Sequence, residues 1–298
     1  MSDGQKHDPM IASCPDGRSA GTCLALLASA MQFAALALPG GAACAKDDNA
    51  ALAQQLANPI ADLTVVPFQY DLLLNGGPDG DATGSVLTIQ PIIPIHLNKD
   101  WNLITRTILP VAYASGIPTG DFGGLGDTQF SAFLSPQKSG ADGLVWGIGS
   151  IVNLPTATNS DLGTSEWGAG PTAVALVQKG PWTVGALANH LWTFDDAPAG
   201  AATRSLTTTG AGYVDQTFTQ PWVTYGWGSG QSVTLTSQTS YNWNSDEWTV
   251  PLNLTYQSVG KLGDQSVQFQ VGGAYAPIVP DDYPNWGLQA SLIFLFPN

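Results

Sequence analysis

Residues 286–296 read WGLQASLIFLF, and this stretch decides the fold class. One face of an extended chain here would carry Trp286, Leu288, Ala290, Leu292, Phe294 and Phe296, and the other begins with Gly287, Gln289 and Ser291. Because successive side chains of a strand point to opposite faces, this spacing predicts a strand with one apolar face. Aromatic rings lie at both ends of that face and it carries no charge, which is typical of a strand in contact with lipid.

The same two-residue alternation recurs upstream. Residues 231–243, 248–256 and 265–276 each set apolar side chains on one face against amides and hydroxyls on the other. A soluble β-sandwich places charged side chains on its outward face, but these strands carry almost no charge on either face. The pattern favours lipid outside and a polar lumen inside.

About twelve such segments follow one another along the chain. We expect them near residues 64–74, 84–95, 101–114, 125–135, 143–154, 166–178, 181–194, 213–225, 231–243, 247–257, 265–276 and 286–296. An even number of strands returns both ends of the chain to one side of the membrane, as in single-chain bacterial barrels. The predicted fold is therefore all-β, a transmembrane antiparallel up-and-down β-barrel of about 12 strands over residues 64–298.

The connections between these segments alternate in length and in charge. Tight turns such as 96–100, 179–180 and 226–230 alternate with long loops such as 76–83, 116–124, 155–165, 195–212 and 277–285. Lysines lie in the tight turns, and aspartates crowd the long loops. We expect the tight turns in the periplasm and the acidic loops outside the cell, where they either attract cations or simply solvate the loops.

The first 45 residues resemble an export signal. Arg18 precedes the apolar run CLALLASAMQFAALAL, and small residues around Cys44 lead into charged residues, so we expect a signal peptide over residues 1–45. A lipoprotein anchored through Cys44 is the alternative, although Gly41 stands where a bulky aliphatic residue is expected. Residues 46–63 are then a short periplasmic segment in which Asn49–Ala57 can form a helix. All three cysteines lie in the predicted signal, so the mature chain would form no disulfide.

Composition narrows the class of protein further. The chain has 298 residues, of which only 11% are charged, with 34 Gly, 21 Pro and 10 Trp. Its net charge of −14 argues against nucleic-acid binding, which needs a basic surface. We expect outer-membrane lipids, a small-molecule solute and the barrel assembly machinery as partners, and the outer membrane of a Gram-negative cell as the location.

Arg106, Asp127 and Asp71 are candidates for a constriction of the lumen. Arg106 is the one basic residue firmly inside a predicted strand. An arginine side chain that faces lipid at the bilayer centre costs about 2–4 kcal/mol. We therefore expect Arg106 to face the lumen or lie near a rim, paired with Asp127 or Asp71. Such a pair either serves only to avoid a lone buried charge or lines a constriction that selects solute.

His190 is the fourth candidate lumen residue. An outer-membrane hydrolase needs a histidine beside a Ser or Thr nucleophile, but a single histidine in a strand is also a common wall residue. After the predicted signal peptide, no G-x-S-x-G motif is present. His96 and His190 are the only histidines after the predicted signal, so we expect neither a metal site nor a cofactor.

Tryptophans cluster toward the ends of the predicted strands. Nine of the ten lie at positions 101, 146, 167, 182, 192, 222, 243, 248 and 286. This placement predicts rings at the membrane interfaces, with a ligand-stacking platform as the alternative.

Several phrases of the sequence resemble one family. They are LAQQLANPIADLTVVPFQYD, IQPIIPIHLNKDWNLITRTILPV, GLGDTQFSAFLSP, WGAGPTAVALVQKGPWTVGALANHLWTF and the ending WGLQASLIFLFPN. Over residues 52–298 the chain resembles outer-membrane transporters grouped with the MetA-pathway of phenol degradation proteins. The resemblance implies a barrel and passage of small compounds that are often aromatic or apolar. It supplies no catalytic residues.

The expected function is passage of small, hydrophobic or aromatic solutes by passive diffusion, and we expect no enzyme activity. Two alternatives stay open: an outer-membrane hydrolase of lipids that uses His190, and a structural barrel.

Overall fold

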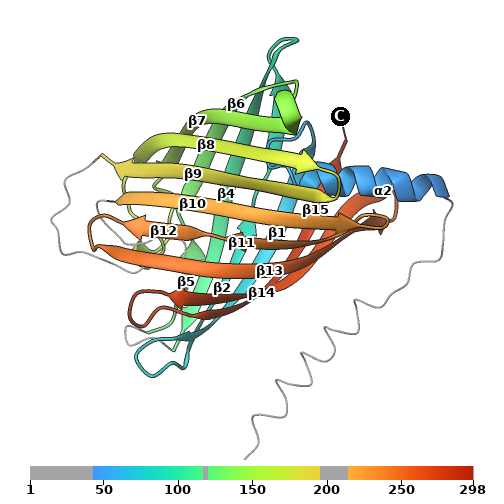
Figure 1. Ribbon diagram of the computed structural model, residues 1–298. Coiled ribbons are helices and arrows are strands. Elements are labelled where there is room, and N and C mark those ends of the chain that lie inside the picture. Colours follow the sequence, from blue (N-terminus) through green and yellow to red (C-terminus); the bar gives the residue numbers. More distant parts are fainter. Residues whose placement is uncertain (1–42, 117–119, 195–213, 298) are drawn as a thin grey trace, which may run out of the picture. The chain divides into compact units, whose positions relative to one another are not determined.

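Fifteen strand segments form one antiparallel sheet that closes on itself. The computed structural model describes residues 43–116, 120–194 and 214–297. The segments are β1 (Thr64–Gly76), β2 (Ala82–Ile89), β3 (Ile92–His96), β4 (Trp101–Ser115), β5 (Phe122–Leu125), β6 (Thr128–Pro136), β7 (Leu144–Leu154), β8 (Gly168–Lys179), β9 (Trp182–Thr193), β10 (Asp215–Trp227), β11 (Gln231–Ser237), β12 (Thr239–Asn242), β13 (Glu247–Leu262), β14 (Gln265–Ile278) and β15 (Trp286–Phe296). Strands that follow one another in the chain pair with each other, and β1 pairs with β15 from Thr64 opposite Phe296 to Leu74 opposite Trp286 (Figure 1).

Twelve strands result, because three pairs of segments are single strands with a local break. β2 and β3 both pair with β1 and β4, β5 and β6 both pair with β4, and β11 and β12 both pair with β10 and β13. Pro91 lies in the first break and has no backbone N–H to donate to the ladder. Gly126 lies in the second, where its N–H donates to the carbonyl of Pro110 at 2.9 Å. The predicted twelve-stranded up-and-down barrel is confirmed.

Short and long connections lie at opposite ends of the barrel. One end holds the tight turns, such as that between β8 and β9, together with the start of β1 and the end of β15. The other end holds the long connections, of which residues 117–119 and 195–213 lie outside the described part of the chain. We call these the short-turn end and the long-loop end.

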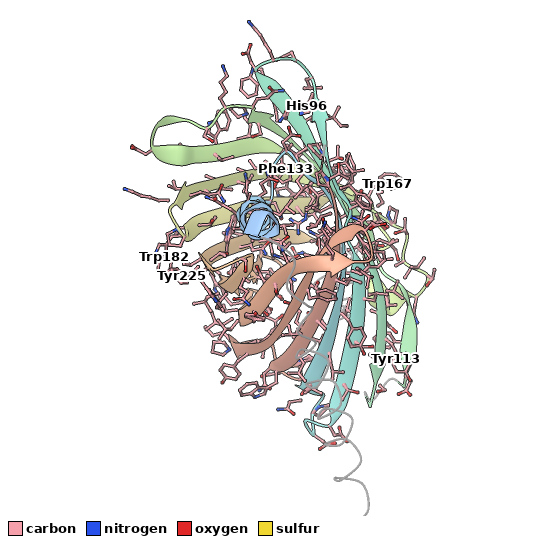
Figure 2. The ribbon with its side chains drawn as sticks, turned by 90° about the vertical axis from the view of Figure 1, so that its right-hand side faces the viewer. His96, Tyr113, Phe133, Trp167, Trp182 and Tyr225 are labelled. Carbon is pink, nitrogen blue, oxygen red and sulfur yellow. The ribbon has the colours of Figure 1, made fainter. Side chains whose placement is uncertain are left out.

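The outer wall is apolar and carries aromatic rings at both ends. On β15, Trp286 and Leu288 are 52% and 42% exposed. Trp182 and Tyr225 lie side by side at the short-turn end (Figure 2). Their ring centroids are 4.7 Å apart. At the long-loop end the Tyr241 ring lies 4.8 Å from that of Trp243. An apolar surface of this extent is stable only in hydrocarbon, with rings at the two interfaces.

The expected interface position of Trp222 is wrong, because its side chain points inward and is 9% exposed.

A helix and the segment after it occupy the short-turn end. α2 (Ala43–Leu56) covers most of the segment that we expected to be helical, and it lies where the C-terminus lies (Figure 1). The helix ends at Leu56, and two residues later the side chain of Asn58 accepts a hydrogen bond from the N–H of Ile60 at 3.0 Å. Ala53 packs in a buried cluster with Val259 and Leu295 on the inner face of the barrel. No helix in the described ranges is long and apolar enough to cross a membrane.

The predicted signal peptide lies almost wholly in residues 1–42, outside the described residues, and stays a prediction.

Candidate functional site

A cavity of about 450 Å³ lies inside the barrel. Amide side chains dominate its polar wall: Gln69, Gln90, Gln129, Asn189, Gln216, Gln220, Gln238, Asn253, Asn285 and Gln289. These come from eight of the twelve strands because, with period-two alternation, every second residue of each strand faces inward. The charged residues among those that line the cavity are Asp71, Arg106 and Asp127.

Arg106 lies on the inner face of β4, two residues from the buried Ile104. Its partner is Gln90, in the break between β2 and β3. With the Gln90 amide turned to satisfy both groups, Oε1 accepts from Nε and Nη2 of Arg106 at 2.8 and 3.1 Å. Among the described residues, no carboxylate lies within ion-pair distance of the guanidinium. The expected pairing of Arg106 with Asp127 or Asp71 is therefore wrong.

Asp71 is held on the inner face of β1 by two amides. Gln69 Nε2 donates to Oδ2 at 2.8 Å, and Gln289 Nε2 on β15 donates to Oδ1 at 2.9 Å. The register explains both bonds, because Gln69 shares the inner face of β1 and Gln289 lies directly opposite Asp71. Both oxygens of the carboxylate therefore accept hydrogen bonds from neutral amide donors.

Asp127 fastens the connection between β7 and β8 to the barrel wall. Its Oδ2 accepts from the N–H and the hydroxyl of Thr164, at 2.6 and 2.8 Å, and from Asn153 at 3.1 Å. Its Oδ1 accepts from the N–H of Ala157 at 3.2 Å, and the side chain is 1% exposed. A Cβ on Gly163 would lie 2.5 Å from Oδ1, so only glycine allows this close approach.

The β7–β8 connection consequently folds into the long-loop end of the barrel. Leu162, in the short 3₁₀ turn η3 (Ser160–Leu162), is fully buried against Val86 and Ala112 on the inner wall. This segment narrows the lumen from that end. Asp127 therefore shapes the lumen by holding a loop, a role that the sequence did not reveal.

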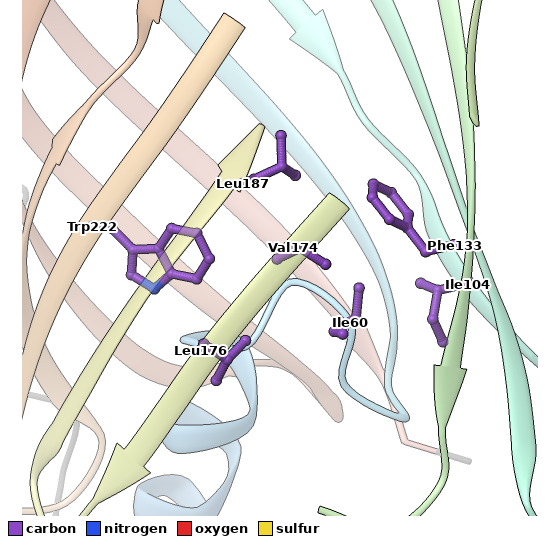
Figure 3. Close-up of a cluster of buried hydrophobic side chains, with 7 residues drawn as sticks. All are labelled: Ile60, Ile104, Phe133, Val174, Leu176, Leu187 and Trp222. Carbon is purple, nitrogen blue, oxygen red and sulfur yellow. The ribbon is translucent and has the colours of Figure 1, made fainter. Parts of the chain in front are cut away.

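Apolar side chains form the floor of the cavity toward the short-turn end. Ile60 is 5% exposed and belongs to a buried cluster with Ile104, Phe133, Val174, Leu176, Leu187 and Trp222. Figure 3 shows Ile60 on the loop after α2, between Val174 and Leu176 on one side and Ile104 and Phe133 on the other. Phe133 and Leu187 also line the cavity. We call this cluster the Ile60 floor, and it corrects the expectation of a lumen that is polar throughout.

His190 faces away from the lumen. Its neighbours in β9, Asn189 and Leu191, line the cavity, so His190 lies on the outer wall. The expectation that His190 is a lumen residue is therefore wrong. The sequence did not show which face of β9 points inward, because β9 carries apolar side chains on both faces.

On the outer wall, His190 meets two residues of β10. Its Nδ1 lies 2.8 Å from Thr217 Oγ1, and its Nε2 lies 2.8 Å from Asp215 Oδ1. Trp243 Nε1 donates to the same Thr217 oxygen at 2.9 Å. Thr217 is directly opposite His190 in the ladder, so the sheet itself sets the contact.

The described residues contain no group of three His, Cys, Asp or Glu side chains placed to bind a metal ion.

Sequence reasoning missed Gln90 and Ile60. A signal existed for each: Pro91, beside Gln90, has no backbone N–H to donate to a strand ladder, and Ile60 follows the helix-ending pair Asn58-Pro59.

A closed barrel with an apolar outer wall, two aromatic girdles and an amide-lined lumen defines a transmembrane β-barrel of the outer membrane.

Comparison with known proteins agrees with this class. No protein-family model and no curated protein matches the chain. Among solved structures it is similar to the COG4313 outer membrane channel from Pseudomonas putida F1, at TM-score 0.60 and 18% identity over 79% of this chain and 96% of that chain. A weaker likeness is to outer membrane phospholipase A from Escherichia coli, at TM-score 0.41 and 14% identity over 82% and 98%. At these identities the first likeness shows the fold, and the second carries no argument.

Proposed function

We propose that this protein is an outer-membrane channel through which small apolar or aromatic solutes diffuse passively. The observation that carries the proposal is the lumen itself, an amide-lined cavity that lies between the inward-folded β7–β8 connection and the Ile60 floor. A barrel of 12 strands lies between small barrels that side chains fill and large open porins, so a narrow path fits its size. The family resemblance in the sequence and the fold of the Pseudomonas channel both support this function.

The Ile60 floor is the proposed gate. Its contacts close the lumen at the short-turn end. Residues 57–63, which carry Ile60, contact the wall through side chains, such as the buried Leu63 and the Asp62–His96 pair, and lie outside the strands. Displacement of residues 57–63 would open the path without breaking any strand pairing. The floor thus supplies a reason for low basal conductance.

The test is conductance and solute flux of the folded full chain. Planar bilayers should show discrete current steps, and proteoliposomes should admit small aromatic solutes faster than liposomes without protein. Neither current nor flux from the folded protein would refute the channel function and would favour a structural barrel.

A second candidate function is hydrolysis of a membrane lipid at the outer wall. Asp215, His190 and Thr217 place a carboxylate, an imidazole and a hydroxyl in the order that nucleophilic hydrolysis uses. His190→Ala should abolish phospholipid or lipopolysaccharide turnover, if wild-type protein shows any. His96→Ala is the matched control, because His96 also lies 2.8 Å from an aspartate but at the exposed short-turn end. No turnover by wild-type protein would discard this candidate.

A further inference from the structure

We propose that Arg106 binds the carboxylate of small organic monocarboxylates with an apolar body, as a selective site just above the Ile60 floor. This inference rests on the proposed channel function and names its class of solute.

The Arg106 guanidinium has bonding capacity to spare. A guanidinium carries five N–H donors, and Gln90 accepts from only two of the nitrogens that bear them. The residue lines the cavity, so the remaining donors face space that a solute can enter. A guanidinium offers parallel donors that match the two oxygens of a carboxylate, and it loses little hydration on pairing.

The two acidic residues that line the cavity do not compete for Arg106. Asp71 and Asp127 are both occupied by amide, hydroxyl or backbone donors. Ser131 lies opposite Arg106, and Asp127 is four residues further along the same wall, which places it about 13 Å away. Ile92 pairs with Arg106 on one side and with Val65 on the other, so Val65 lies at the height of Arg106 in the barrel. Asp71 is six residues after Val65, about 20 Å further along β1. The positive charge is therefore left without a counter-ion of its own.

The surroundings of Arg106 add the apolar half of the site. Ile108 follows on the inner face of β4, and Phe133 and Ile151 lie on the inner faces of β6 and β7; all three line the cavity. An inorganic anion would satisfy the guanidinium but would leave these side chains against water. A carboxylate with a short aliphatic or aromatic body satisfies both, and a cavity of about 450 Å³ admits one.

The experiment measures block of the potassium chloride current by hexanoate and benzoate in planar bilayers. We expect wild-type current to fall saturably with each carboxylate and to be insensitive to hexanamide and hexylammonium. Arg106→Gln should raise the half-blocking concentration at least tenfold, about 1.4 kcal/mol, and Arg106→Lys should lie between, since lysine keeps the charge and loses the fork. Lys138→Gln is the matched control, because it removes the same charge from an exposed turn.

Calorimetry of hexanoate binding to the folded protein in detergent separates this inference from the channel function. Binding that Arg106→Gln weakens tenfold supports the site even if wild-type protein carries no current. The inference would be overturned if hexanamide or acetate bound wild-type protein as tightly as hexanoate does. It would also be overturned if hexanoate bound wild-type and Arg106→Gln protein equally. Folding of each variant is checked by the heat-dependent shift of barrel mobility in SDS electrophoresis, and Arg106→Lys supplies the readout if the Gln variant does not fold.

Discussion

Ile60→Ala removes three carbons from the floor that closes the lumen. Ile60 is 5% exposed and contacts apolar side chains from facing walls of the barrel. Burial of each carbon contributes about 0.8 kcal/mol, so the closed arrangement loses about 2.4 kcal/mol relative to one in which the segment is displaced into water. The ratio of open to closed channels should then rise about 50-fold, since 1.4 kcal/mol is a factor of ten.

Single-channel recording checks this prediction directly as the fraction of time spent conducting. Ile95→Ala is the matched control: it makes the same chemical change on the outer face of β3, where the side chain is 44% exposed. We expect Ile95→Ala to conduct as wild type does, and both variants to show the same heat-dependent mobility. An open fraction of Ile60→Ala no greater than that of the control would refute the gate, because the contacts that define it would then contribute nothing to closure.

Two further predictions concern the wall and the loop. Gly149→Ala should prevent folding, because its Cβ would lie 1.7 Å from the carbonyl oxygen of Ala132 and force β6 and β7 apart. Gly260→Ala is the control and should fold normally, because its Cβ would have no atom within 4 Å. Equal yields of heat-shifted barrel from the two variants would contradict this prediction. Asp127→Asn turns one of two acceptor oxygens into a donor that faces donors, and hydrogen bonds to a charged group contribute about 1.5–3 kcal/mol each. Hydrogen exchange in residues 155–167 should therefore become faster, with Asp142→Asn at an exposed position as the control, and unchanged exchange would show that the loop is held by other contacts.

The strand content of the barrel could be read from the sequence with little loss. The stretch 286–296 is a strand over its full predicted range, with Trp286 and Leu288 outward and Gln289 and Ser291 inward. The alternation was sufficient there because one face is apolar along its whole length and the other begins with Gly287, Gln289 and Ser291, so the pattern fixes both the strand and its orientation. The break at Pro91 could not be predicted from the alternation, because the register with β1 and β4 is the same on both sides of it and the two-residue pattern continues through it.

The candidate site was predicted only in part. Arg106, Asp71 and Asp127 do line the lumen, but their partners are Gln90, two further amides and a loop, rather than one another. Strand spacing explains the difference: Asp127 is four residues further along the adjacent strand from the position opposite Arg106, beyond the reach of any side chain.

The sequence by itself determined that this chain makes an even set of amphipathic antiparallel strands with lipid-facing rings, because side-chain alternation is a local property. Only the tertiary structure decided which face of β9 carries His190, which segment fills each end of the lumen, and that Arg106 faces a cavity without a carboxylate beside it. Those features depend on which residues the strand register places at the same height in the barrel, and on where residues 57–63 and 155–167 fold back. No local pattern of side chains encodes these long-range arrangements.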